Sequence, residues 1–123
     1  MDKIKILVIE DNEENWIAAK SSLRKHADCT LAVTVADALK LFNENEFDLV
    51  LLDLQLPDRP GLDFVKEVRG GTKSPNIPVY ALTASVLQID SKEALDAGCN
   101  GFISKPYTRK ELLENLSEHI HNE

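Results

Sequence analysis

Leu49-Val50-Leu51-Leu52-Asp53 is an apolar run without alternation that ends on a carboxylate. A strand with one face in water alternates apolar and polar side chains, whereas a strand covered on both faces is apolar throughout. The stretch is therefore predicted to be a central strand of a parallel sheet. Asp53 would lie at the exposed end of that strand.

Other apolar runs along the chain also end beside a polar side chain. They are residues 4–9 before Glu10 and Asp11, residues 79–82 before Thr83, and residues 101–104 before Lys105. The carboxyl ends of parallel strands meet at one edge of an open α/β sheet, where ligands bind. Carboxylates, a hydroxyl and an ammonium are thus predicted to gather at that edge.

Segments of helical period separate the apolar runs, which is the pattern of βαβ units. The expected elements are a helix capped by Asn12, a strand at about residues 29–33, a helix capped by Thr34, a helix after Gly61, a helix over residues 86–97 capped by Gly98, and a last helix from Thr108 or Arg109. The polar connection over residues 70–76 is expected to be a mobile loop. The predicted fold is α/β, with a parallel sheet between helices.

Composition limits the classes of function. A length of 123 residues fits one domain, residues 1–123, with no output domain, and the net charge of −7 has the wrong sign for direct nucleic-acid binding. No apolar stretch approaches the roughly 18–20 residues of a membrane span, and no leader precedes the first strand. A cytoplasmic protein without a membrane partner is expected. Cys29 and Cys99 are expected to be reduced structural thiols.

The predicted cluster has a specific chemistry. Glu10, Asp11 and Asp53 offer the oxygen ligands that Mg²⁺ prefers. A carboxylate can also form an aspartyl-phosphate, provided that the repulsion between anions is cancelled. The Thr83 hydroxyl and the Lys105 ammonium could then bind the phosphoryl oxygens. Each residue alone has a simpler explanation, such as a helix cap or a solvated lysine, so the prediction depends on their joint register.

The chain resembles the receiver domain of two-component response regulators over its whole length. The motifs that carry this resemblance are Val8-Ile9-Glu10-Asp11-Asn12, Leu52-Asp53-Leu54-Gln55-Leu56-Pro57 with Gly61, Leu82-Thr83-Ala84, and Lys105-Pro106. The resemblance implies a flavodoxin-like doubly wound (βα)5 fold. Its five-stranded parallel sheet would have the order 2-1-3-4-5 and be flanked by five helices.

The resemblance also implies roles for single residues. Asp53 would be the phosphoacceptor, and Thr83 and Lys105 would contact the phosphoryl oxygens. The Lys105-Pro106 bond would be cis, and Thr83 and Phe102 would be the switch residues. Mg²⁺ or Mn²⁺ would be bound by Glu10, Asp11, Asp53 and the backbone carbonyl of Gln55. Glu10 stands where Asp is commoner, and its longer arm is expected to hold the metal through water. Neither Gln55 nor Ser85 is a strong general base, so a phosphoryl lifetime well beyond seconds is expected.

The implied function is a signalling switch rather than an enzyme, although the domain would promote its own phosphorylation and dephosphorylation. A histidine kinase or a histidine phosphotransfer protein would donate to Asp53, and a surface that binds an unidentified downstream protein would change. The alternatives left open are a receiver excised from a hybrid histidine kinase or from a DNA-binding response regulator, and a phosphorylation-independent binding module. Phosphorylation-dependent dimerisation also stays open.

Two other classes fit the motifs less well. Aspartyl-phosphate phosphatases need an acid two residues after the nucleophile, where this chain has Gln55. A flavodoxin-like cofactor carrier needs a phosphate-binding loop after the first strand, where Glu10, Asp11, Glu13 and Glu14 would repel phosphate. His26, His119 and His121 are expected to be surface groups without chemistry.

Overall fold

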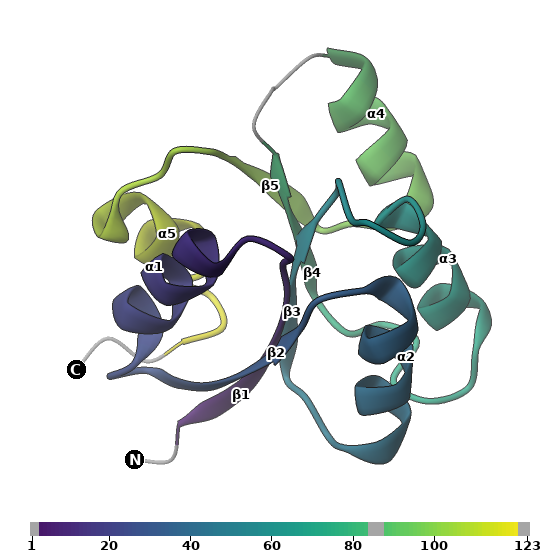
Figure 1. Cartoon of the computed structure of the whole chain (residues 1–123), viewed down its shortest axis with the longest axis horizontal. Coiled ribbons are helices and arrows are strands. Elements are labelled where there is room, and N and C mark those ends of the chain that lie inside the picture. The colour runs from purple at the N-terminus through teal and green to yellow at the C-terminus, as the bar shows by residue number, and fades with distance from the viewer. Residues whose placement is uncertain (1–2, 84–87, 121–123) are drawn as a thin grey trace.

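The computed structural model describes residues 3–83 and 88–120, which form alternating strands and helices (Figure 1). The elements are β1 (Ile4–Ile9), α1 (Glu13–Leu23), β2 (Ala27–Ala32), α2 (Val35–Glu44), β3 (Leu49–Asp53), α3 (Leu62–Gly70), β4 (Val79–Thr83), α4 (Gln88–Ala97), β5 (Gly101–Ser104) and α5 (Arg109–Asn115).

The strands form one parallel sheet in the order β2-β1-β3-β4-β5, as predicted. Figure 1 shows the sheet nearly edge-on, with α1 and α5 on one face and α2, α3 and α4 on the other. The doubly wound fold is therefore confirmed. Its carboxyl edge collects the ends of β1, β3, β4 and β5.

β3 is the centre of the sheet, and all five of its residues are buried. Leu49 and Leu51 belong to the core under α1 and α5, whereas Val50 and Leu52 belong to the core under the other three helices. A strand covered on both faces can be apolar at every position, which is why its sequence shows no alternation.

Side-chain caps start three of the helices where the sequence predicted them. The Asn12 side chain accepts a hydrogen bond from the Asn15 N–H at 2.9 Å, and the Thr34 hydroxyl accepts one from the Asp37 N–H at 3.0 Å. Thr108 and Glu111 form a reciprocal capping box at the start of α5. These caps fix the direction of the chain as it leaves the sheet edge.

The structure differs from the expectations at several boundaries. β2 spans Ala27–Ala32 rather than residues 29–33, because its first residues pair with the beginning of β1, Ala27 opposite Ile4. α5 ends at Asn115, although Leu116 and Ile120 are buried. α4 begins at Gln88 in the described part of the chain, and Ser85 and the expected helix start at Val86 lie outside the described residues.

The connection over residues 70–76, expected to be a mobile loop, makes specific contacts. The Lys73 ammonium donates to the carbonyl oxygens of Asn43 at 3.1 Å and Asn45 at 2.6 Å, at the end of α2. The Arg69 guanidinium donates to the Pro75 carbonyl at 2.8 Å. This polar loop therefore joins α3 to the carboxyl end of α2.

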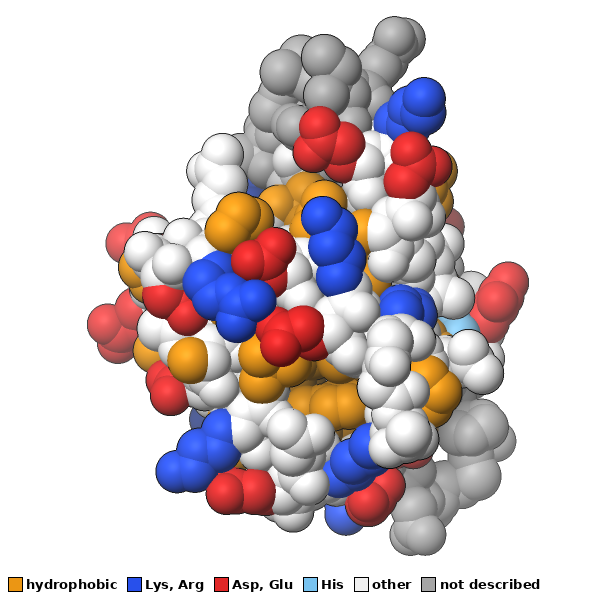
Figure 2. Space-filling model, turned by 90° about the vertical axis from the view of Figure 1, so that its right-hand side faces the viewer, with side chains coloured by type: hydrophobic (Ala, Val, Ile, Leu, Met, Phe, Trp, Pro, Cys, Tyr) orange, Lys and Arg blue, Asp and Glu red, His pale blue; other side chains and the backbone are white. Residues whose placement is uncertain are grey.

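The face made by α2, α3 and α4 carries charges of both signs. Figure 2 shows acidic and basic side chains interspersed there with apolar ones. In the loop before α3 and on that helix, Arg59 pairs with Asp63 at 3.2 Å and with Glu67 at 2.8 Å.

Two remaining expectations concern the thiols and the membrane. Cys29 is half-buried and Cys99 is buried, and both are free thiols, as expected. Within residues 3–83 and 88–120, no helix has the length and apolar character needed to cross a membrane.

Candidate functional site

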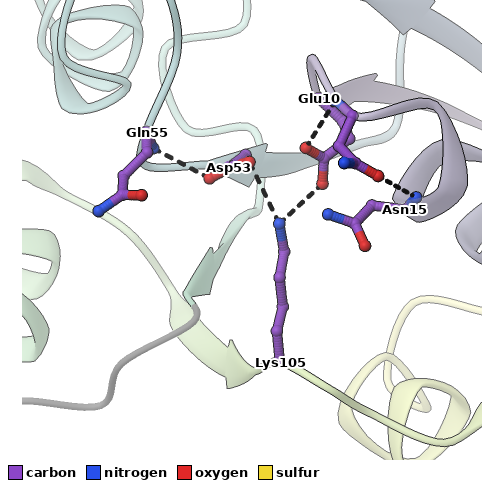
Figure 3. A network of polar contacts seen from close by, with 6 residues as sticks. Glu10, Asn15, Asp53, Gln55 and Lys105 are labelled. Carbon is purple, nitrogen blue, oxygen red and sulfur yellow. Dashed lines mark hydrogen bonds and ion pairs between the residues drawn. The ribbon is translucent and has the colours of Figure 1, made fainter.

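The polar residues that follow the strands converge at the carboxyl edge of the sheet (Figure 3). Glu10 follows β1, Asp53 ends β3, Thr83 ends β4 and Lys105 follows β5. The register places Asp53 opposite Leu82 and Thr83 opposite Ser104, so these strand ends are level with one another. The gathering predicted from the sequence is therefore present in the structure.

Lys105 lies between two of the carboxylates. Its Nζ donates to Glu10 Oε1 at 2.8 Å and to Asp53 Oδ2 at 3.1 Å (Figure 3). The backbone fixes this reach, because the Lys105 N–H donates to the Thr83 carbonyl at 2.7 Å. The Lys105-Pro106 peptide bond is cis, as the resemblance implied.

Glu10 is the most deeply buried acid of the cluster, with only 1% of its surface exposed. Its Oε2 accepts a hydrogen bond from the Asn12 N–H at 3.3 Å. Burial raises the pKa of Glu10, and the neighbouring Asp53 raises it further, against the opposing effect of Lys105. Both oxygens of Glu10 are thus engaged within the protein.

The Lys105 ammonium is held in its charged form. Burial alone would lower its pKa, but the hydrogen bond to Glu10 and the charge of Asp53 outweigh burial and raise it. The cluster therefore keeps one positive charge among its acids at neutral pH.

Asp53 is buried and directs its two oxygens differently. Oδ2 meets Lys105, whereas Oδ1 accepts a hydrogen bond from the Gln55 N–H at 2.9 Å (Figure 3). Asp53 also lines a cavity of about 580 Å³ together with Asp11, Thr83 and Lys105. Its carboxylate is therefore both anchored and accessible from the cavity, as a reacting group must be.

The acids of the cluster fit a divalent cation. Glu10, Asp11 and Asp53 each offer an oxygen, and these oxygens lie within 4.8 Å of one another. Two ligands of one Mg²⁺ can be at most about 4.2 Å apart, twice the bond length of about 2.1 Å. The donor set thus suits Mg²⁺ if one acid, such as the already paired Glu10, acts through a water.

Phe102 lies outside the polar cluster. It is half-buried and packs against the core under α2, α3 and α4, opposite Ala81 of β4. The structure thus places the expected switch aromatic on β5, with β4 between it and β3. Thr83, the other expected switch residue, is buried at the end of β4 and lines the cavity.

Two of the residues that line the cavity were not predicted from the sequence. Asn15 of α1 and Glu93 of α4 also line the cavity, and Asn15 points towards Lys105 in Figure 3. Asn15 lies in the first turn of the helix that Asn12 caps, so the predicted cap could have indicated its place near the sheet edge. Nothing in the sequence indicated Glu93, because its place depends on how α4 packs.

His119 was expected to be a surface group, and this prediction is wrong. His119 is half-buried, and its Nε2 lies 2.9 Å from the Tyr80 hydroxyl, with the rings 5.5 Å apart. His119 therefore binds the turn after α5 to β4, away from the acidic cluster. His26 is half-buried as well, and His121 lies outside the described residues.

Comparison with protein families and curated proteins gives several matches. The family model described as the response regulator receiver domain matches residues 6–117. The aerobic respiration control sensor protein ArcB of Escherichia coli K12 is 43% identical over 105 residues, which are 84% of this chain but 13% of ArcB. The polar-differentiation response regulator DivK of Brucella ovis is 29% identical, and the match covers 94% of both chains. This chain thus spans a small part of the sensor protein and nearly all of DivK.

Solved structures give the same fold. The receiver domain of the sensor histidine kinase PA1611 from Pseudomonas aeruginosa has a TM-score of 0.87 and 31% identity, covering 96% of this chain and 98% of that one. That structure has a magnesium ion coordinated in its active site cleft. The chemotaxis response regulator CheY4 of Vibrio cholerae has a TM-score of 0.89 at 24% identity, covering 95% of this chain and 98% of CheY4.

Proposed function

This chain belongs to the response regulator receiver domain family, a family of phosphoacceptors in two-component signalling, and we propose that Asp53 is the residue that accepts the phosphoryl group. The observation that carries the assignment is the Asp53 carboxylate, which lies at the end of β3 beside the Lys105 ammonium and lines the cavity. Glu10 is a poorer candidate, because its surface is almost fully covered and it is absent from the lining of the cavity.

The surroundings of Asp53 support attack on phosphorus. One carboxylate oxygen would form the new O–P bond while the bond from phosphorus to the donor's imidazole nitrogen breaks, and that nitrogen keeps the electron pair. Lys105 would offset the charge of the phosphoryl oxygens, and the Thr83 hydroxyl would donate a hydrogen bond to one of them. The domain would in this way promote its own phosphorylation and, with water as the attacking group, its dephosphorylation.

Mg²⁺ or Mn²⁺ is the proposed cofactor. Asp11, Asp53 and the backbone carbonyl of Gln55 would hold the ion, with Glu10 acting through water. When bound, the ion supplies positive charge next to the phosphoryl oxygens. The magnesium in the PA1611 receiver domain supports this proposal by similarity.

The proposed donor is a histidine kinase or a histidine phosphotransfer protein. ArcB and PA1611 are named as sensor proteins, which favours a receiver that works within or beside a hybrid kinase. The match to nearly the whole of DivK favours a stand-alone regulator instead. In either setting, Thr83 and Phe102 would couple phosphorylation to the surface that binds a downstream protein, or to dimerisation.

The first test is phosphorylation by a small donor. The protein is incubated with Mg²⁺ and acetyl phosphate, and its intact mass is followed for wild type, Asp53→Asn and Asp48→Asn. Asp48 is a matched control, because it is an exposed carboxylate next to the opposite end of β3. We expect one phosphoryl adduct on wild type and Asp48→Asn, none on Asp53→Asn, and none after chelation.

Each other outcome has a defined meaning. An adduct on Asp53→Asn would overturn the assignment of Asp53. No adduct on wild type, with Mg²⁺ binding shown by calorimetric titration, would support a binding module that acts without phosphorylation.

A further inference from the structure

We infer that Asp58 is a positioning residue of the proposed metal and phosphoryl site: by capping α2 it fixes the loop that carries Gln55. This inference rests on the proposed function, because it concerns the same site. Asp58 itself is exposed and is absent from the lining of the cavity, so it would act only through the loop.

Asp58 uses both of its oxygens on the start of α2. The Val35 N–H donates to Oδ1 at 3.0 Å, and the Ala36 N–H donates to Oδ2 at 3.1 Å. The first N–H groups of a helix have no partner within the helix, and the helix dipole favours an anion at that end. The hydrogen bond from Val35, together with the one from Ala36, lowers the pKa of Asp58, so the carboxylate is ionised at neutral pH.

α2 has its own N-cap in Thr34, so Asp58 is a second capping residue that comes from a distant part of the chain. The Thr34 hydroxyl accepts the Asp37 N–H. Asp58 lies 23 residues from Val35 in sequence and provides the partners that Thr34 leaves unmet. The contact therefore joins two loops of the same sheet edge rather than neighbouring residues.

The loop over residues 54–61 is closed at its base. The Gly61 N–H donates to the Leu54 carbonyl at 3.1 Å, and Gln55 pairs with Pro60 as an isolated antiparallel bridge. Asp58 follows Pro57 at the tip of this narrow loop. Gln55 thus lies between a closed base and a tip that is fastened to α2.

This arrangement limits how far the backbone of Gln55, a residue that lines the cavity, can move. The base fixes the position of Gln55, and the Gln55 N–H is already bound to Asp53 Oδ1. If the tip is released from α2, the loop can shift as a whole and carry the Gln55 backbone out of the place that it would need beside Asp11 and Asp53. Groups that orient metal ligands from outside the ligand set contribute measurably to metal affinity.

Lys73 provides a matched comparison. It fastens the opposite end of α2 through the carbonyls of Asn43 and Asn45, and it comes from the loop after α3. Both Asp58 and Lys73 cap α2 from outside the helix, but only Asp58 belongs to the loop that carries Gln55. Loss of either cap should loosen α2, whereas only loss of Asp58 should disturb the metal site.

The first experiment measures Mg²⁺ affinity directly, by calorimetric titration of the unphosphorylated protein. We expect Asp58→Ala to weaken Mg²⁺ binding about tenfold, Asp58→Asn to stay within about threefold of wild type, and Lys73→Ala to bind as wild type does. An asparagine oxygen can still accept one N–H but carries no charge. Wild-type affinity in Asp58→Ala overturns the inference, and so does equal loss in Asp58→Asn and Asp58→Ala, which would indicate a charge effect.

The second experiment uses the reciprocity of coupled sites. If fastening the loop favours Mg²⁺ binding, then bound Mg²⁺ must favour the fastened loop. Amide hydrogen exchange at Val35 and Ala36 should become slower when Mg²⁺ is added to wild type, but not in Asp58→Ala. The Glu111 amide, capped by Thr108 in α5, serves as the internal control. Unchanged exchange at Val35 and Ala36 in wild type would overturn the inference.

Failure of the proposed function would be recognised separately. If wild type takes up no phosphoryl group from acetyl phosphate, phosphorylation at Asp53 fails as a proposal. The Mg²⁺ titration and the amide exchange would still decide whether Asp58 positions the loop.

Discussion

Gly61 packs directly against the main chain of Asp53. A Cβ on Gly61 would lie 2.5 Å from the Asp53 carbonyl oxygen and 3.0 Å from the Cα of Leu54. Real Cβ atoms do not approach backbone atoms so closely, and backbone cannot move aside as a flexible side chain can. The absence of a side chain at Gly61 is therefore a condition for the position of Asp53.

Gly61→Ala should displace the end of β3 and the loop after it. We expect the free energy of unfolding to fall by about 1–3 kcal/mol, as for other overpacked sites, and Mg²⁺ binding to weaken. Gly70→Ala is the control, because a Cβ there meets nothing within 4 Å. That variant should be neutral or more stable by up to about 1 kcal/mol. Equal stabilities in chemical denaturation would contradict the prediction.

Lys105→Met should change metal binding and phosphorylation in opposite directions. The Lys105 ammonium competes with a cation for Glu10 and Asp53, so its loss should tighten Mg²⁺ binding by roughly three- to tenfold. Phosphorylation by acetyl phosphate should become slower, since the charge that offsets the phosphoryl oxygens is gone. Lys110→Met makes the same change on the exposed face of α5 and should alter neither Mg²⁺ affinity nor the rate of phosphorylation. Weaker Mg²⁺ binding in Lys105→Met would refute the predicted competition.

Arg69 should not be replaceable by lysine. Its guanidinium donates to the Gly98 carbonyl at 3.1 and 2.8 Å, to the Pro75 carbonyl at 2.8 Å and to the Asn100 side chain at 3.1 Å. A single ammonium cannot serve these positions together, so Arg69→Lys should cost about 1–3 kcal/mol. Thermal or denaturant unfolding, with the exposed Arg24→Lys as control, measures the difference. A wild-type midpoint for Arg69→Lys would mean that these bonds contribute little.

The thiols should make stability depend on alkaline pH. Burial raises the pKa of both Cys29 and Cys99 from 9.0 to about 11. The unfolded state then loses its thiol protons first, so their contribution is intact below pH 9 and is lost as the pH rises towards 11. Each thiol should account for a loss on the order of 2 kcal/mol in the free energy of unfolding. The free energy of unfolding of the Cys29→Ala/Cys99→Ala variant should fall less steeply than that of wild type over this pH range. An unchanged slope would exclude the thiols as the cause of the fall.

The phosphorylated domain should persist well beyond seconds. The Gln55 side chain is a weak general base, and so is Ser85, which lies outside the described residues. Intact mass followed after rapid removal of acetyl phosphate gives the lifetime. Gln55→Glu, which introduces a stronger base, should shorten it. A lifetime of a few seconds in wild type would show that another group activates the water.

The sequence predicted best those elements that local pattern determines. β3 matches its expected bounds because burial on both faces makes the run apolar from end to end. β2 was misplaced because it is an edge strand whose first residues, Ala27 and Asp28, have no strand-like pattern. In the last helix, leucine or isoleucine recurs every four residues, at Leu112, Leu116 and Ile120. This spacing continues past the end of α5 and so could not mark where the helix stops.

For the site, the sequence predicted the convergence of Glu10, Asp53 and Lys105, because their positions depend only on strand ends. Contacts that depend on loops or on helix packing could not be predicted from the sequence. Asp58 meets Val35 across 23 residues, and Tyr80 meets His119 across 39. Such pairs depend on the path of a whole loop or the tilt of a helix, and no local pattern encodes either.

The burial of β3 has a consequence before the protein folds. In the unfolded chain, residues 49–52 form a short, uncharged, aliphatic segment of the kind that pairs with its copies and aggregates. Asp48 and Asp53 flank the segment and act as gatekeepers, whose charges oppose contact between chains. The carboxylate proposed to receive the signal in the folded protein thus also helps unfolded chains to stay apart until residues 49–52 are buried in the folded sheet.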